Sequence, residues 1–378
     1  MKAVLVSNLF SNHMLPLSFS LQKLCDSFDF IVTEETSNIG FLQSSQADFV
    51  TYYYKDEERE IAKQKIIDAD FVIFGSCPQE LLELRMNENK LSFLYSERFF
   101  KKGVWRRFIP RTVKAIYNRS IKFKNKNFFV LCASAYLSYD LSLLGFPVSK
   151  CFKWGYFPVC DCIDSDEINK KRENTILWAG RFLKWKHPEV AVLVAHMLKK
   201  NGIRFQMNIV GAGPEKRHLE RLISKYNLNE NVRTLGSKSH DDLMELMREH
   251  RIYMFTSDFY EGWGAVLNEA MASGCAVVAS HAIGSVPFLL KDGENGRIYR
   301  YGSIDEAYRI VAKLLRSPDL CAEYGKKAIS TVKNDFSCEV AAKRICSFAK
   351  AFINGEELPH FESGVMSSAE VLKNNWKD

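Results

Sequence analysis

Short apolar runs alternate with helical segments along the whole of this 378-residue chain. In the first half the runs cover residues 2–7, 28–33, 69–74, 91–95 and 127–132. In the second half they cover residues 176–179, 205–210, 232–235, 252–255 and 276–279. Alternating strands and helices predict doubly wound, largely parallel α/β sheets. Because 47% of the residues are hydrophobic, the chain can fill the cores of two such domains.

Composition along the chain predicts where these domains begin and end. Residues 158–175 are polar, mixed in charge and without periodicity, which is typical of an interdomain linker. We therefore expect a Rossmann-like N-terminal domain over residues 1–158 and a second domain over residues 175–335. Residues 336–353 carry apolar side chains at helical spacing, and residues 354–378 read as a polar tail.

The stretch 258–280 combines a loop, a helix and an apolar strand. Gly262 and Gly264 flank Trp263 where the loop becomes the helix, and glycines allow backbone N–H groups to approach a bound group closely. The start of a helix also favours phosphate. Glu261 lies before this seat and Glu269 one turn inside the helix. Because a diphosphate would repel both carboxylates, we expect them to accept hydrogen bonds from hydroxyl groups, as on a sugar and a ribose.

Two cations follow the strand at residues 176–179, namely Arg181 and Lys186. Fixed cations can stabilise a departing diphosphate without a metal ion, and an arginine can grip two oxygens at once. The alternative is a pair of ordinary surface cations. A Gly-Ala-Gly-Pro turn with Gly211 and Gly213 follows the strand at residues 205–210, a position that suits phosphate binding.

Residues 98–126 contain eleven basic residues and no acidic one. Subtracting these eleven charges from the formal net charge of +7 leaves −4 for the rest of the chain. Aromatic side chains are interleaved with the basic ones. Such a segment suits an anionic membrane or a diphosphate-bearing lipid, or nucleic acid, or it is a solvated helix whose aromatics face the core. We expect the membrane contact and no nucleic acid, because the second half carries candidate residues for a diphosphate and a sugar.

Two further features bear on location. The apolar residues 3–10 are too short for a secretory signal, and no apolar run is long enough to span a membrane. The ten cysteines show no paired metal-ligand spacing. We expect a cytoplasmic protein with reduced thiols and no bound metal, with residues 98–126 as its peripheral contact to the inner face of the membrane.

The two glutamates of the stretch 258–280 have the spacing Glu-x7-Glu, and this stretch resembles the signature of retaining glycosyltransferases of family 4. That family has the GT-B fold, in which two Rossmann-like doubly wound domains face a central cleft. The resemblance implies that residues 1–158 bind the acceptor, that residues 175–335 bind the nucleotide-sugar, and that the helix at residues 336–353 returns to the N-terminal domain. The resemblance implies that Glu261 faces the donor sugar and that Glu269 holds the ribose of the nucleotide. It also places Arg181 and Lys186 at the diphosphate.

The resemblance extends to other motifs of the second half, with two departures. Gly211 and Gly213 match the Gly-x-Gly-Pro turn of the family. The segment 284–288 is similar to its Gly-Gly-x-Pro-Glu motif, but Ser285 replaces a glycine and Phe288 replaces the acid. Ser285 could still donate to a phosphate, whereas Phe288 bears on which sugar is preferred; the fold is unaffected. The loop SNHMLP and the stretch KWGYFP also resemble a subgroup of bacterial polysaccharide-assembly transferases.

His13 lies in the loop 8–16 after the first strand. In GT-B enzymes the corresponding loop lies near the acceptor and the donor sugar. This histidine would contact either substrate or carry a proton, or it is a solvated loop residue.

Together these features predict a retaining, metal-independent hexosyltransferase. The donor would be a UDP- or GDP-sugar acting as co-substrate, with no other cofactor, and backbone N–H groups of residues 262–264 would support its diphosphate. The acceptor would be a hydroxyl of a glycan or lipid-linked glycan. Two alternatives remain open, namely a nucleotide-sugar epimerase of the same fold and a non-catalytic protein that binds nucleic acid or membrane.

Overall fold

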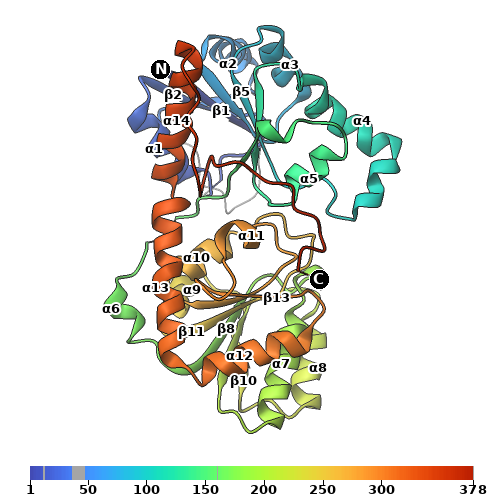
Figure 1. Cartoon of the computed structure of the whole chain (residues 1–378), viewed down its shortest axis with the longest axis vertical. Helices are drawn as coiled ribbons and strands as arrows, with labels where there is room; N and C mark the ends of the chain where they lie inside the picture. Colours follow the sequence, from blue (N-terminus) through green and yellow to red (C-terminus); the bar gives the residue numbers. More distant parts are fainter. Residues whose placement is uncertain (12, 36–46, 160, 378) are drawn as a thin grey trace. The chain divides into compact units, whose positions relative to one another are not determined.

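The computed structural model describes residues 1–11, 13–35, 47–159 and 161–377. Asn12, in the loop that carries His13, is outside these ranges. The chain divides into two compact units, and each is a parallel β-sheet flanked by helices (Figure 1). The first unit comprises residues 1–159 and 335–373, and the second comprises residues 160–334 and 374–378.

The sheet of the first unit has seven strands among the described residues, in the order β3-β2-β1-β4-β5-β6-β7. The strands are β1 (Lys2–Ser7), β2 (Ser27–Val32), β3 (Val50–Tyr52), β4 (Phe71–Phe74), β5 (Ser92–Ser96), β6 (Phe128–Cys132) and β7 (Cys151–Lys153). Neighbouring strands all pair in parallel. The strand order reverses between β1 and β4, and in such sheets ligands bind at the carboxyl ends of the strands beside this switch point.

Helices on both sides bury the apolar strands of this sheet. They are α1 (Leu15–Leu24), α2 (Asp56–Asp68), α3 (Gln79–Asn87), α4 (Pro110–Arg119), α5 (Leu137–Ser142) and α14 (Cys338–Asn354), with short 3-10 turns η2 (Val104–Phe108), η3 (Ile121–Phe123) and η4 (Val148–Lys150). Proline in the first turn of α1 fixes the backbone angle that a helix start needs. Late in the chain, α14 returns to pack beside α1 and buries Ala341, Ile345 and Phe348 (Figure 1).

The second unit has a six-stranded parallel sheet in the order β10-β9-β8-β11-β12-β13. The strands are β8 (Arg172–Ala179), β9 (Gln206–Val210), β10 (Val232–Thr234), β11 (His250–Phe255), β12 (Ala276–Ser280) and β13 (Arg297–Tyr299). Here the order reverses between β8 and β11. The loops that leave the carboxyl ends of these two strands are therefore the expected ligand-binding loops.

The helices of the second unit enclose one large apolar core. They are α6 (Ser165–Ile168), α7 (Pro188–Lys200), α8 (Lys216–Lys225), α9 (His240–Glu249), α10 (Val266–Ala272), α11 (Val286–Leu289), α12 (Ile304–Leu315) and α13 (Pro318–Asp335), with the 3-10 turn η5 (Lys184–Lys186). Side chains of α7, α8 and α12 pack with those of the central strands in this core. The predicted fold class is confirmed, because both halves are doubly wound parallel sheets.

Two segments differ from what the sequence led us to expect. Residues 160–174, within the expected linker, belong to the second unit, where Ile163 and Ile168 pack beneath Gly274. A backbone hydrogen bond from Ile163 to Ala272 fixes this segment. Because the segment is mostly polar, the burial of these two isoleucines was not predicted.

The expected polar tail is also structured. Val365, Met366 and Ala369 are buried, and backbone hydrogen bonds join residues 366–369 to strand β7. An antiparallel bridge pairs Phe152 with Ser368. This segment covers the edge of the first sheet, where unpaired backbone groups would otherwise be exposed.

Candidate functional site

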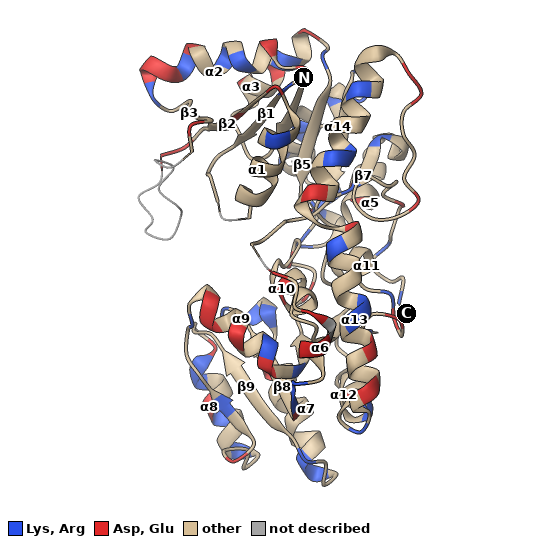
Figure 2. Ribbon diagram, turned by 90° about the vertical axis from the view of Figure 1, so that its left-hand side faces the viewer, with Lys and Arg blue, Asp and Glu red and all other residues tan. Residues whose placement is uncertain are grey.

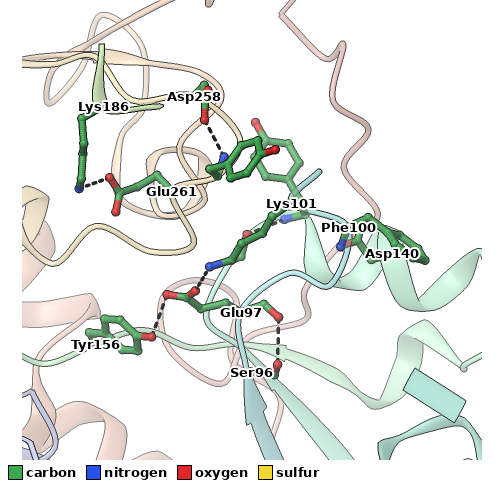
Figure 3. Close-up of polar contacts among 12 residues, drawn as sticks. Ser96, Glu97, Phe100, Lys101, Asp140, Tyr156, Lys186, Asp258 and Glu261 are labelled. Atoms are coloured by element: carbon green, nitrogen blue, oxygen red, sulfur yellow. Dashed lines mark hydrogen bonds and ion pairs between the residues drawn. The ribbon is translucent and has the colours of Figure 1, made fainter. Parts of the chain in front are cut away.

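Lys186 and Glu261 form an ion pair at the switch point of the second sheet (Figure 3). Lys186 ends the turn η5 after β8, and Glu261 lies in the loop after β11. Both side chains are largely buried. The sequence predicted each residue as a site residue, and the structure brings them into direct contact.

Further hydrogen bonds fix the backbone around this pair. Ser257 Oγ donates to the Glu261 carboxylate at 2.8 Å. Thr256 Oγ1 donates to the carbonyl of Lys186 at 2.7 Å, and the indole N–H of Trp178 donates to Thr256 Oγ1 at 2.8 Å. The two loops therefore hold each other, and the ammonium and the carboxylate are preorganised rather than mobile.

His187, which the sequence analysis did not single out, completes the link between the loops. Its ring nitrogens contact Glu189 at 2.7 Å and Asp258 at 3.2 Å, and the Tyr301 hydroxyl lies 3.2 Å from Nε2. Hydrogen bonds to Asp258 and then Glu189 raise the pKa of His187 to about 9. The residue has φ 49° and ψ 50°, a left-handed conformation that is uncommon outside glycine. A cationic histidine thus clamps the turn that carries Lys186.

The glycine turn packs directly against the loop of Arg181. A Cβ atom at Gly211 would lie 1.9 Å from the carbonyl oxygen of Gly180, and one at Gly213 would lie 2.6 Å from that of Phe182. Only glycine permits this approach. The side chain of Arg181 is exposed at this loop, beside the turn that ends in Lys186.

Glu269 is carried by α10. Its side chain is largely buried, and His240 Nδ1 lies 3.8 Å from its carboxylate. Burial raises the pKa of Glu269, and the charge of His240 opposes this shift. A carboxylate in such a setting favours a ligand that donates hydrogen bonds over one that carries negative charge.

The side chain of Trp263 is fully buried, and its indole N–H donates to Asn268 at 2.9 Å. It therefore supports the loop from inside, so that any contact of this residue with a donor would come from its backbone. Gly264 has φ 83°, and a Cβ atom there would lie 2.5 Å from the ring of Phe255. Among the described residues, no acceptor is found for the backbone N–H groups of Gly262 and Gly264.

His13 lies in the first unit at a cavity of about 450 Å³. The cavity is formed at the carboxyl ends of β1, β4 and β5. The imidazole of His13 is stacked on the ring of Tyr156, with centroids 5.8 Å apart. The structure therefore places His13 at a ligand-sized cavity and in contact with another side chain of that cavity.

The basic segment 98–126 separates into two classes of side chain. Four members are engaged within the first unit: Arg98 is buried against Asp140, Lys101 pairs with Glu97, Lys122 pairs with Glu83, and Arg119 donates to the carbonyls of Gly75 and Cys77. The remaining seven have no acidic partner among the described residues: Lys102, Arg106, Arg107, Arg111, Lys114, Lys124 and Lys126. By contrast, acidic and basic side chains are interspersed along α2, where they pair with each other (Figure 2).

The aromatic side chains of this segment separate in the same way. Phe100 and Phe123 are buried, whereas Trp105, Phe108 and Tyr117 are 58%, 74% and 50% exposed. The expectation that the whole segment is a surface patch is therefore corrected. A smaller set remains at the surface, on η2 and α4.

In the described part of the chain, no group of three or more His, Cys, Asp or Glu side chains is arranged to hold a metal ion. Every helix within the described ranges is too short or too polar to cross a lipid bilayer.

The second unit is similar to known proteins. A family model for glycosyl transferases group 1 matches residues 163–331. An uncharacterised glycosyltransferase of Methanocaldococcus jannaschii is 26% identical over 194 residues, which are 50% of this chain and 49% of that protein. The putative colanic acid biosynthesis glycosyltransferase WcaL of Escherichia coli K12 is 28% identical over 182 residues, 47% of this chain and 45% of that protein. The chain thus spans about half the length of the curated relatives it matches.

Among solved structures, Alr3699/HepE of Anabaena in complex with UDP has a TM-score of 0.71 at 15% identity. The likeness covers 93% of this chain and 100% of that chain, so it concerns both units. At so low an identity it shows the fold alone. Residues 163–331 thus match the glycosyl transferases group 1 family model, and the chain has the two-domain GT-B fold.

Proposed function

We propose that this protein transfers a sugar, with retention of anomeric configuration, from a nucleotide-sugar to a hydroxyl of a glycan or lipid-linked glycan during polysaccharide or glycoconjugate assembly. The observation that carries the proposal is the buried Lys186–Glu261 pair at the switch point of the family-matched unit. The UDP complex of the Anabaena protein and the naming of the E. coli relative for colanic acid biosynthesis support it.

In the proposed donor site, the charged residues of the second unit bind different parts of the donor. Arg181 and Lys186 bind the diphosphate, helped by backbone N–H groups of residues 262–264, and Glu269 binds the ribose. In the free protein Lys186 neutralises Glu261. When a diphosphate takes over the ammonium, the Glu261 carboxylate is released to accept hydrogen bonds from the donor sugar, while Ser257 still orients it. One preformed ion pair can thus bind both the diphosphate and the sugar of the donor.

The reaction we propose needs no nucleophile from the protein. The bond between the anomeric carbon and the diphosphate breaks, and the acceptor hydroxyl attacks from the same face. Its proton passes to the departing diphosphate oxygen. Arg181 and Lys186 stabilise the charge that develops on the diphosphate without a metal ion, and His13 contacts the substrates from the first unit.

Substitution of the ion pair tests this assignment. Lys186→Ala and Glu261→Ala are each expected to lower kcat by about 100-fold or more, because Lys186 stabilises the charge that develops on the diphosphate and Glu261 orients the donor sugar. The matched control is Lys184→Ala, which removes an exposed lysine from the same turn η5. Release of nucleoside diphosphate from a panel of UDP- and GDP-sugars, with oligosaccharide acceptors, measures turnover. Full activity of both variants would exclude these roles.

Two further readouts separate the alternatives. An epimerase would convert the donor in the absence of any acceptor, whereas a transferase requires one for product. The anomeric configuration of the product, determined by NMR, tests retention directly.

We also propose that the exposed part of the basic segment, on η2 and α4, contacts an anionic membrane. Arginine and lysine attract anionic head groups, and tryptophan, phenylalanine and tyrosine are suited to the boundary between head groups and acyl chains. Trp105, Phe108 and Tyr117 are exposed among basic residues that lack acidic partners. Such a contact would bring the enzyme to a lipid-linked acceptor.

A further inference from the structure

The cavity of the first unit has the lining of a carbohydrate site. It lies at the switch point of the sheet, where β1, β4 and β5 end in Ser7, Gly75 and Ser96. Its volume of about 450 Å³ is in the range of small-molecule sites. Every lining residue belongs to the first unit, so the cavity can be considered without reference to the second.

One part of the lining is aromatic. The ring of Tyr156 is stacked with that of His13 and packs edge-to-face with that of Tyr95, at a centroid distance of 5.7 Å. These contacts fix the orientation of Tyr156. Aromatic side chains present an apolar face together with a polar edge, and a pyranose ring likewise has a C–H face and a rim of hydroxyls.

The polar part of the lining centres on Glu97. The Tyr156 hydroxyl donates to Glu97 Oε1 at 2.8 Å, and Lys101 pairs with Oε2 (Figure 3). A carboxylate accepts about four hydrogen bonds, so these two contacts orient Glu97 and leave about half of its capacity for a ligand. Ser7, Ser11 and Ser76 add hydroxyl groups to the same lining.

The charges at the cavity argue against an anionic ligand. Arg98 is buried in an ion pair with Asp140, and its guanidinium group lies over the ring of Tyr136. Arg119 donates to the backbone carbonyls of Gly75 and Cys77, and Lys101 is paired with Glu97. The cations near the cavity thus already have partners, while the carboxylate of Glu97 would repel a phosphate.

We infer that this cavity binds an uncharged sugar ring and that Glu97, oriented by Tyr156 and Lys101, is a specificity-determining residue that accepts a hydrogen bond from one of its hydroxyls. Identification of this ring as the terminal sugar of the acceptor rests on the proposed function. Binding of the ring by the first unit does not, because it needs no donor.

Direct binding tests the inference on the full chain without nucleotide. The probes are methyl glycosides of common neutral pyranoses at millimolar concentration, with inorganic phosphate as the anionic comparison, and saturation-transfer NMR is the readout. We expect at least one glycoside to bind and phosphate not to displace it. Glu97→Gln and Tyr156→Phe are each expected to weaken this binding about tenfold, as for a hydrogen bond to a charged group.

The matched control is Glu83→Gln, because Glu83 also pairs with a lysine, Lys122, but does not line the cavity. Circular dichroism confirms that each variant is folded. Absence of binding by every glycoside, displacement by phosphate, or unchanged affinity in both cavity variants would overturn the inference. If the wild type binds a glycoside but releases no nucleoside diphosphate from any donor, the proposed function fails and the sugar site stands.

Once an acceptor is known, kinetics gives a second test. Glu97→Gln should raise the KM for the acceptor about tenfold, and Glu83→Gln should not. An unchanged acceptor KM in Glu97→Gln would contradict the assignment of this ring to the acceptor.

Discussion

At the scale of single residues, His187 shows how local strain and charge support the candidate donor site. A non-glycine residue in the left-handed region costs on the order of 1–3 kcal/mol. Here the side chain offsets that cost through its contacts with Glu189 and Asp258. Because His187 directly follows Lys186 in the chain, the contacts that fix His187 also hold the lysine in place.

The charge of His187 predicts a pH dependence of stability. Its pKa is raised from 6.5 to about 9 in the folded protein. The stabilisation is therefore fully present below about pH 6.5 and is lost as pH rises through about 9. His187→Gly removes the imidazole and relieves the strain. The wild type should lose on the order of 2 kcal/mol relative to this variant between pH 6 and pH 10.

Thermal unfolding of both proteins over this pH range measures the effect. If the melting temperatures of the wild type and His187→Gly change in parallel with pH, the ionic clamp does not contribute to stability.

The sequence singled out candidate site residues but did not show how they are arranged. Residue type and spacing singled out Lys186 and Glu261, because charged residues that follow predicted strands can be recognised in the sequence. Their direct pairing was not visible. Nor was the burial of Trp263, since an aromatic residue between glycines suits a ligand surface as well as a loop core. His187 gave no signal, because its left-handed backbone is a property of the folded turn.

At the scale of elements, strands of four or more residues were predicted from their apolar runs. Of the strands with only three residues, β10 was predicted from the run 232–235, whereas β3, β7 and β13 were missed because so short a run shows little of a period. The segment that pairs with β7 was read as a polar tail for a related reason. Its buried apolar side chains are only Val365, Met366 and Ala369. Its pairing with the edge strand β7 is a long-range contact, which a local sequence pattern does not reveal.

The η2–α4 surface gives the prediction that belongs to this scale. Trp105→Ala combined with Phe108→Ala should reduce the fraction of protein bound to phosphatidylglycerol vesicles several-fold, because both side chains would insert at the head-group boundary. Ile61→Ala is the control, since Ile61 is also half exposed, at 52%, but lies on the charge-paired helix α2.

Co-sedimentation with phosphatidylglycerol and with phosphatidylcholine vesicles, at low and high salt, provides the measurement. Binding should require the anionic lipid and weaken with salt. Equal binding by the wild type and the double variant, or binding to neutral vesicles alone, would exclude this surface as the membrane contact.

At the scale of the whole molecule, the candidate sites are divided between two sheets of the same architecture. In each unit the candidate site lies where the strand order reverses, with Lys186 and Glu261 in the second unit and Glu97 in the first. The alternation of strands and helices predicted both sheets. The boundary of the second unit was less predictable, because residues 160–174 and 374–378 join it through a few tertiary contacts.

The central claim is that the second unit binds an activated sugar through its diphosphate by means of Lys186. Calorimetric titration of the wild type, Lys186→Ala and Lys184→Ala with UDP, GDP and ADP tests it most directly. We predict that at least one nucleotide binds the wild type and Lys184→Ala with equal affinity and binds Lys186→Ala at least about tenfold more weakly, as expected for loss of a charge-assisted contact. Absence of binding heat with all three nucleotides, or equal affinity of Lys186→Ala and the wild type, would contradict the claim.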